Sequence, residues 1–284
     1  MVEANTQSFD YIVIGAGSGG MASGRRAAAL GKSVCMIENR VIGGTCVNVG
    51  CVPKKVMFNL ANFLEEAHAM KGYGVGGGEA LTLDFPAFKA KRDAYVLRLN
   101  GIFRTNVGKA AIHYVEGTAS FVSDKVVKVG DKLYTGEHIL IASGSMPDSG
   151  TFPGVEHTID SDGFFAMEEL PKRAVVIGGG YIGVELAQIF AAFGVKVTLI
   201  VRSIILRFCD RDIIEVLMEN MRKLGVEIKL DASHREVVKN DDGSLTVKLA
   251  DGSEVPCDLC LCATGRPPNI EPLGLANTSV EVVK

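Results

Sequence analysis

The sequence predicts an α/β protein because one local pattern occurs twice along its 284 residues. An apolar run at residues 9–14 leads into a glycine turn at 15–20, and a helical pattern follows. The same order returns at residues 173–177 and 178–183. A strand, a glycine turn and a helix in this order are typical of dinucleotide-binding units. We therefore expect two Rossmann-like domains of three-layer ββα type, the second inserted in the first, each with a small antiparallel β-meander.

The first glycine turn has the features that a dinucleotide requires. Gly15 permits a tight turn, Gly17 lets the backbone approach a pyrophosphate at the helix N-terminus, and Gly20 lets the helix pack closely on its strand. A second strand at residues 33–37 ends at Glu38, whose carboxylate is suited to the hydroxyl groups of a ribose. Because strand, turn, helix and acid occur together, we expect this half to bind a dinucleotide.

Two cysteines follow this half. Cys46 and Cys51 are separated by four residues, a span short enough for a bent backbone to bring them within disulfide distance. A helix predicted from Lys54 onward places its N-terminus and the charges of Lys54 and Lys55 nearby, which favours a thiolate and a lowered thiol pKa. A redox pair is one interpretation, and two inert buried thiols or a metal site are the alternatives. The metal site is disfavoured because no partner His or Cys lies close in sequence.

The rest of the first domain is expected to complete a sheet. Residues 85–109 have helical periodicity, and residues 112–133 alternate in short strands with turns between them, which predicts a β-meander. A strand at residues 138–142 would return the chain to the first sheet. The glycine and proline cluster at 147–153 is the best domain boundary, so the first domain is predicted to span residues 1–148.

The second half differs from the first where its second strand ends. The strand predicted at residues 196–201 is followed by Arg202 instead of an acid, and Arg207 comes five residues later. Arginine suits a 2′-phosphate, which a carboxylate would repel, so this half is expected to prefer NADP(H) to NAD(H). The alternative is a loop with two solvated arginines. A further helix at 212–224 and strands near 227–228, 245–249 and 258–263 complete the predicted domain.

Composition excludes several function classes. A net charge of −3 with interspersed signs gives no basic field for nucleic acid or anionic membranes. The first residues lack the features of a signal peptide, and the apolar runs are broken by charges and glycines, so we expect a cytoplasmic protein without membrane spans. Seven cysteines, an odd number, favour a reducing compartment in which a disulfide would be catalytic or regulatory.

The remaining cysteines and histidines are not expected to bind a metal. Cys257, Cys260 and Cys262 lie in or beside an apolar strand, where cysteine commonly acts as a small core residue. The five histidines are scattered without partner spacing, and none is expected to act as a catalytic base. We predict no metal site.

The segment Gly-Gly-Thr-Cys-Val-Asn-Val-Gly-Cys-Val-Pro-Lys-Lys-Val-Met at residues 43–57, placed between two dinucleotide folds, resembles the redox-active signature of the glutathione reductase branch of the flavoprotein disulfide reductases. Lys55 separates it from the lipoamide dehydrogenases, which typically carry serine there. The resemblance covers residues 9–269 and implies FAD and NADPH as cofactors and glutathione disulfide as substrate. It implies that Cys51 faces the flavin and that Cys46 attacks the substrate.

The resemblance also implies the other site residues. Lys54 and Glu185 match an ion pair of the family and join Cys46 and Cys51 as catalytic residues, while Tyr181 matches a tyrosine that covers the flavin. Arg202 and Arg207 match the 2′-phosphate clamp, although the loop joining them is about one residue shorter than is usual. The cofactor-binding positions implied are Gly15, Gly17, Ser18, Gly19, Gly20, Glu38, Gly44, Thr45, Cys46, Lys54, Gly117, Ala142, Gly144, Gly178, Gly180, Tyr181, Ile182, Gly183, Glu185, Arg202, Arg207, Gly265 and Arg266.

Glutathione contacts are matched by Ser18, Arg25 and Tyr95, whereas Phe103 stands where some relatives have tyrosine. A thioredoxin, trypanothione or other low-molecular-weight disulfide reductase is therefore the alternative within the enzyme class. A non-catalytic nucleotide-binding fragment is the alternative outside it.

Relatives continue past this length with the rest of the FAD site and with a dimerisation domain that supplies a catalytic histidine. We expect residues 149–268 to form the NADP(H) domain and residues 269–284 to begin the return to the FAD domain. The full-length family is expected to form homodimers. The 284-residue chain alone is expected to be part of a longer enzyme and not to turn over efficiently.

Overall fold

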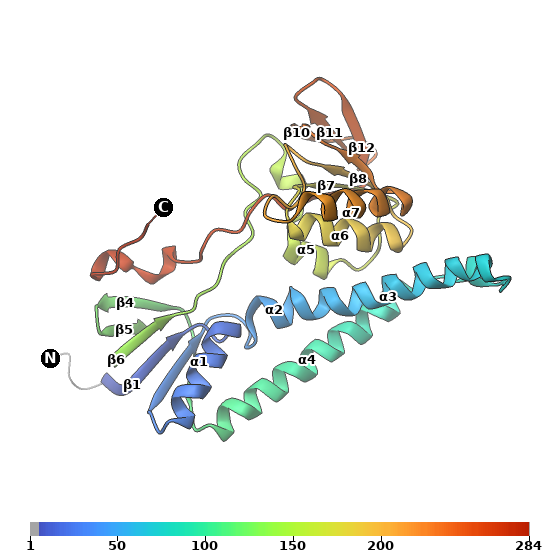
Figure 1. Cartoon of the computed structure of the whole chain (residues 1–284). Helices are drawn as coiled ribbons and strands as arrows, with labels where there is room; N and C mark the ends of the chain where they lie inside the picture. The colour runs from blue at the N-terminus through green and yellow to red at the C-terminus, as the bar shows by residue number, and fades with distance from the viewer. Residues whose placement is uncertain (1–5, 284) are drawn as a thin grey trace. The chain divides into compact units, whose positions relative to one another are not determined.

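The computed structural model describes residues 6–283, which form two compact units (Figure 1). Of the described residues, unit 1 contains 6–52, 93–146 and 268–283, and unit 2 contains 53–92 and 147–267. The chain thus leaves unit 1, builds unit 2 and returns, so the second fold is inserted in the first.

Unit 1 is built on one six-stranded sheet in the order β3-β2-β1-β6-β5-β4. Strands β3, β2, β1 and β6 are parallel, and β6 continues into an antiparallel meander with β5 and β4. The elements are β1 (Thr6–Ile14), α1 (Ser18–Ala29), β2 (Val34–Glu38), α2 (Gly44–Asn48), β3 (His113–Glu116), β4 (Ala119–Ser123), β5 (Val126–Val129) and β6 (Lys132–Ile141). The expected meander begins later than predicted, because residues 113–116 pair parallel with β2.

The sheet of unit 1 is covered on both faces. Alternate residues of β1 point to opposite sides: Val13 packs in a cluster with Met21 of α1 and Val107, whereas Ile12 packs in a cluster with Phe121 and Tyr134 of the meander. These two apolar layers give the three-layer arrangement that the repeated pattern predicted.

Unit 2 contains a parallel sheet in the order β13-β7-β8-β9 and an antiparallel sheet in the order β10-β11-β12. Its elements are α5 (Ser161–Ala166), β7 (Arg173–Ile177), α6 (Tyr181–Ala192), β8 (Lys196–Ile200), α7 (Arg211–Lys223), β9 (Glu227–Lys229), β10 (His234–Lys239), β11 (Leu245–Leu249), β12 (Glu254–Cys257) and β13 (Leu259–Cys262). Helix α5 and strands β10 and β12 were not among the elements expected from the sequence. The three cysteines of the apolar strand region are buried in the core between the two sheets.

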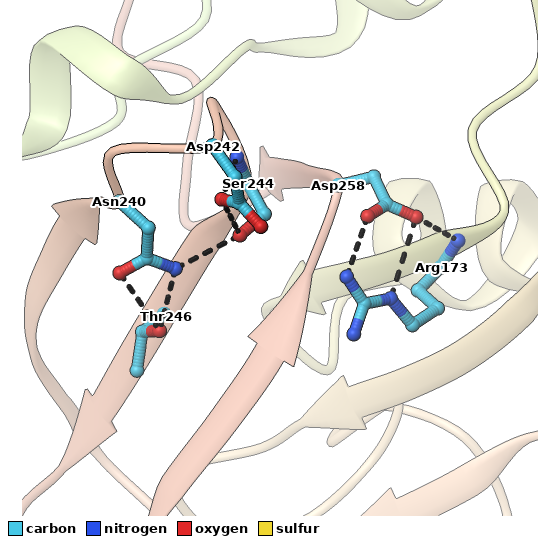
Figure 2. A network of polar contacts seen from close by, with 6 residues as sticks. All are labelled: Arg173, Asn240, Asp242, Ser244, Thr246 and Asp258. Atoms are coloured by element: carbon cyan, nitrogen blue, oxygen red, sulfur yellow. Dashed lines mark hydrogen bonds and ion pairs between the residues drawn. The ribbon is translucent and has the colours of Figure 1, made fainter.

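Figure 2 shows two groups of polar contacts in unit 2, one between the start of β7 and Asp258 and one in the turn between β10 and β11. Arg173, at the start of β7, donates to both carboxylate oxygens of Asp258, with the Nη2 to Oδ1 distance at 2.6 Å. Hydrogen bonds from Arg173 hold the pKa of the Asp258 carboxyl below its ordinary value. In the β10–β11 turn, the Asn240 amide donates to the hydroxyls of Ser244 at 2.9 Å and Thr246 at 3.1 Å.

Helices α3 (Cys51–Ala69) and α4 (Phe85–Lys109) contribute to both units. The predicted first domain kept residues 1–148 together, whereas residues 53–92 cluster with unit 2. Side chains explain this grouping, because Arg92 donates to the Phe165 carbonyl at 2.6 Å and Phe88 packs edge-on against Phe193. Which nucleotide each unit binds stays a prediction.

In each half, the last glycine of the turn lies against the backbone carbonyl of the first glycine of the same turn. A Cβ added at Gly20 would lie 1.8 Å from the Gly15 oxygen, and one added at Gly183 would lie 2.1 Å from the Gly178 oxygen. No side chain fits at such distances, so helix and strand approach through glycine in both units. This shared geometry is physical support for the internal repeat.

Replacing Gly20 with alanine is expected to lower the free energy of unfolding by about 3 kcal/mol, the upper range for overpacking against backbone. Gly19→Ala is the matched control, because a Cβ there meets nothing within 4 Å and alanine favours the helix by up to about 1 kcal/mol. Urea unfolding of the ligand-free variants compares the two. Equal stability of both variants would contradict the close-packing argument.

Candidate redox and nucleotide-binding sites

The predicted redox pair lies in unit 1, within α2 and at the start of α3. Cys46 is in the short helix α2, and Cys51 begins α3. The Asn48 amide, between them in sequence, donates to the carbonyl of Gly44 at 2.9 Å. Asn100 of α4 donates to the Asn48 side-chain oxygen at 3.0 Å. These two amides hold the segment that carries Cys46, and their pairing could not be read from sequence because they are far apart in the chain.

The thiols of Cys46 and Cys51 interact in the structure, and both are free. Burial and then the Cys51 thiol raise the pKa of Cys46, while hydrogen bonds from the Ser18 hydroxyl and the Cys51 backbone oppose this shift. The expectation of a lowered thiol pKa is therefore wrong for Cys46. The lysines expected to lower it have other partners: Lys54 pairs with a carboxylate, and the Lys55 ammonium lies over the Phe58 ring.

Exposure does not assign roles to the two thiols. Cys46 is half-buried and Cys51 is exposed, although the resemblance implies that Cys46 attacks the substrate. Within residues 6–283, no cluster of three or more His, Cys, Asp or Glu side chains could hold a metal ion. The geometry of the pair is thus that of two neighbouring thiols that can exchange with a disulfide, and their roles stay predictions.

Ser18→Ala is expected to slow alkylation of Cys46 by roughly three- to tenfold near neutral pH, since a hydrogen bond to a charged group contributes about 1 kcal/mol or more. The loss of that bond raises the Cys46 pKa further, so less thiolate is present below it. The shift is checked by measuring alkylation rates of Cys46 with iodoacetamide from about pH 6 to about pH 10, a range that brackets ordinary thiol pKa values. Peptide mass spectrometry identifies the alkylated cysteine. Ser23→Ala, on the same helix, is the control. An unchanged rate–pH profile in Ser18→Ala would contradict the role given to Ser18.

The first glycine turn and Glu38 form a cradle that fits a dinucleotide. Glu38 is 8% exposed at the end of β2, and its carboxylate accepts from the backbone N–H of Ala16 at 2.7 Å and of Arg40 at 2.8 Å. Gly17 precedes α1 without a side-chain cap, so the helix N-terminus is open to a phosphate. A Cβ at Gly44 would lie 2.7 Å from the Gly17 Cα, which places the cysteine segment against this turn.

Three further predicted cofactor residues lie at the same edge of the sheet. The Gly117 N–H donates to the Glu38 carbonyl at 2.8 Å, and the Ala142 N–H donates to the Ile14 carbonyl at 2.8 Å. The Gly144 carbonyl accepts from Asn269, where the chain re-enters unit 1. Carboxyl ends of parallel strands are where α/β sheets bind ligands, so this edge is the candidate FAD site.

In unit 2, the second glycine turn opens α6 in the same way. Gly180 precedes the helix without a side-chain cap, and a Cβ there meets nothing within 4 Å. Tyr181 is 64% exposed. After β8, Arg202 and Arg207 are exposed, and Arg207 donates to the Ser203 hydroxyl at 3.2 Å. The residues present therefore fit a dinucleotide with an added phosphate on its ribose.

The Lys54 ammonium lies 2.8 Å from the Glu185 carboxylate in unit 2, and both side chains are partly exposed. Arg266 donates to the Ser161 hydroxyl at 3.0 Å.

Among the predicted substrate residues, Ser18 contacts Cys46, whereas Arg25 and Tyr95 lie on α1 and α4 with exposed side chains. The catalytic and binding roles of all these residues stay predictions.

Comparisons with known proteins agree with this geometry. A family model described as pyridine nucleotide-disulphide oxidoreductase matches residues 9–283. Glutathione reductase from Schizosaccharomyces pombe is 42% identical over 97% of the chain and 61% of its own length, and the enzyme from Yarrowia lipolytica is 42% identical over 99% and 63%. The chain therefore spans about three fifths of these curated relatives.

Solved structures give the same result for the fold. The chain superposes with a TM-score of 0.84 on RclA from Escherichia coli, an HOCl-induced flavoprotein disulfide reductase, at 28% identity over 97% of this chain and 60% of that one. In the part of the chain that the structure describes, no helix has the length and apolar character needed to cross a membrane. Proteins of the matched family typically bind FAD and NAD(P)H. With two Rossmann-like units and a neighbouring cysteine pair, the chain belongs to the pyridine nucleotide-disulphide oxidoreductase family of flavoprotein disulfide reductases.

Proposed function

We propose that this chain carries the nucleotide-binding and redox-active part of an NADPH-dependent reductase of glutathione disulfide. The observation that carries the proposal is the contact between the thiols of Cys46 and Cys51 within the motif at residues 43–57. Two relatives at 42% identity are named glutathione reductase, which supports this choice of substrate.

The cysteine pair supplies the exchange chemistry. The Cys46 thiolate attacks one sulfur of the substrate disulfide, so that a Cys46–sulfur bond forms, the substrate S–S bond breaks and the departing thiolate takes a proton. The Cys51 thiolate then attacks the Cys46 sulfur, which releases the second substrate thiol and leaves a Cys46–Cys51 disulfide. Each cycle therefore needs two electrons to restore the dithiol.

The two cradles would hold the electron carriers. The turn at residues 15–20 and Glu38 would bind FAD, and Arg202 and Arg207 would bind the 2′-phosphate of NADPH. FAD held there would supply the two-electron redox chemistry that links NADPH to the cysteine disulfide. Burial of Glu38 and its two backbone hydrogen bonds keep its carboxylate fixed for this binding.

An anaerobic titration tests the proposal on the chain itself. FAD is added to the oxidised protein, NADPH is titrated in, flavin absorbance is followed, and the thiols of Cys46 and Cys51 are counted by alkylation and mass spectrometry. The expected result is loss of flavin absorbance together with two new thiols at these positions. Flavin that responds to NADPH while the pair stays oxidised would overturn the proposal.

A different disulfide substrate is the second candidate. Phe103 lacks the hydroxyl of the tyrosine found in some relatives, and it packs against the apolar cluster of unit 1. Single-turnover rates of the reduced chain with glutathione disulfide, thioredoxin disulfide and trypanothione disulfide decide between them. The fastest substrate of the panel is expected to be glutathione disulfide. A homodimer and a cytoplasmic setting are further parts of this proposal for the whole enzyme.

A further inference from the structure

The loop at residues 202–210, here called the arginine loop, joins β8 to α7 and carries both arginines proposed to bind the 2′-phosphate. Its tip is exposed, with the Phe208 side chain fully accessible. The central residues of the loop are nevertheless held in place. Ile205 is 1% exposed, and the Leu206 N–H donates to the Gly179 carbonyl of the glycine turn at 2.8 Å. One edge of the loop is therefore anchored to the nucleotide-binding turn.

Arg211 holds the other edge. From the first position of α7 its guanidinium donates to the carbonyls of Ile205 at 2.9 Å, Leu206 at 2.5 Å and Cys209 at 2.9 and 3.2 Å. A planar guanidinium with several fixed donors is suited to bring three carbonyls together. A cation at a helix N-terminus is disfavoured by the helix dipole, so these contacts, and not the helix, account for the position of Arg211.

The backbone between the two anchors is strained. Leu206 has φ of +44°, a left-handed conformation that a branched side chain rarely adopts. Such a conformation persists only where surrounding contacts enforce it. The Leu206 N–H donates to Gly179, and its carbonyl accepts from Arg211 and from the Cys209 N–H. The next residue is Arg207, so the direction in which Arg207 leaves the backbone depends on these contacts, of which Arg211 supplies the side-chain one.

We propose that Arg211 is a positioning residue for recognition of a nucleoside 2′-phosphate. It fixes the peptide between Leu206 and Arg207, so that Arg207 is presented beside Ser203, to whose hydroxyl it donates at 3.2 Å. Arg211 does not serve as a phosphate ligand itself, because its Nε, Nη1 and Nη2 groups all donate to loop carbonyls. This inference rests on the proposed NADP(H) site and adds a residue that acts through Arg207.

Binding measurements test the inference without enzymatic turnover. Dissociation constants of NADP+, NAD+ and adenosine 2′,5′-bisphosphate are determined by calorimetry for the unaltered chain and for Arg207→Gln, Arg211→Gln, Arg211→Lys and Arg222→Gln. Arg222 is an exposed arginine in the last turn of the same helix and serves as the matched control. Hydrogen exchange of residues 203–209 is measured in the same proteins.

Arg211→Gln is expected to weaken binding of NADP+ and of the bisphosphate by roughly tenfold. This is the loss expected when the loop adopts its binding-competent conformation about one tenth of the time. NAD+ binding stays within about twofold because NAD+ has no 2′-phosphate, exchange in the loop accelerates, and Arg211→Lys falls between. The Arg222→Gln control matches the unaltered chain in all three dissociation constants and in hydrogen exchange.

Two outcomes separate failure of the inference from failure of the proposed function. If the unaltered chain binds NADP+ no better than NAD+, the proposed NADP(H) site fails, and the inference with it. If the unaltered chain discriminates and Arg207→Gln abolishes the discrimination while both Arg211 variants retain it, only the inference fails. Equal weakening of NADP+ and NAD+ in Arg211→Lys would show a purely structural role and would also overturn it.

Discussion

Serine substitutions at the two cysteines are expected to stop disulfide reduction at different points. When the reduced chain meets glutathione disulfide, Cys51→Ser should release one glutathione and retain the other as a stable mixed disulfide on Cys46, because no second thiol can resolve it. Cys46→Ser should form little mixed disulfide, and release of both glutathione molecules from one disulfide should slow by at least about 10³-fold in either variant, as loss of a covalent nucleophile usually causes. Intact-protein mass spectrometry reads each product directly.

This experiment also assigns the two roles that exposure leaves open. Cys51 is the more accessible thiol, so a mixed disulfide trapped by Cys46→Ser instead of Cys51→Ser would reverse the assignment. Cys209→Ser is the matched control, because Cys209 is exposed and free but lies outside the redox motif. If the reduced Cys209→Ser chain, mixed with glutathione disulfide in the absence of NADPH, no longer released glutathione, the proposed pair would be contradicted.

Removal of Cys51 has a second expected effect on the same pair. The Cys51 thiol is a cause of the raised pKa of Cys46, so Cys51→Ser lowers that pKa toward its ordinary value. A lower pKa gives more thiolate at neutral pH, and alkylation of Cys46 accelerates there. The rise in rate with pH therefore moves to lower pH, opposite to the shift expected for Ser18→Ala.

The local patterns of the sequence predicted the parts of the fold that are set locally. The strand, glycine turn and helix at residues 9–30 and 173–193 are present because each glycine meets a requirement within its own segment, such as the approach of Gly20 to Gly15. The cysteine motif also predicted the neighbouring thiols. Contacts of this kind are readable because the residues involved are close in sequence.

Features that depend on distant residues could not be predicted in the same way. Strand β3 pairs parallel with β2, although its alternation resembles that of the meander that follows it. The grouping of residues 53–92 with unit 2 depends on Arg92 and on phenylalanine contacts from α4. The raised pKa of Cys46 depends on burial, which sequence does not report, whereas the charges of Lys54 and Lys55 are visible in sequence and are engaged elsewhere.

The double variant Arg202→Gln/Arg207→Gln is expected to remove the preference for NADP+ over NAD+, with a loss of roughly 10²- to 10⁴-fold in the ratio of their affinities. Each charge-assisted hydrogen bond to a phosphate contributes about 1.5–3 kcal/mol, and two arginines are removed. Affinity for NAD+ should change little, since in the proposed site the glycine turn at 178–183 would bind the part common to both nucleotides. Calorimetry with both nucleotides measures the ratio.

The ionic-strength dependence of NADP+ binding is an independent test of the role proposed for Arg202 and Arg207. Both arginines are exposed, so their attraction to a dianionic phosphate is screened by salt. NADP+ affinity of the unaltered chain should fall between low and physiological ionic strength, and the double variant should lose most of this dependence. The single variants divide the effect between the two positions, and Arg235→Gln, an exposed arginine on β10, is the charge-matched control. If the double variant kept both its salt dependence and its preference for NADP+, other residues would have to recognise the phosphate. The change from Glu38 in the first half to Arg202 in the second would then no longer explain nucleotide choice.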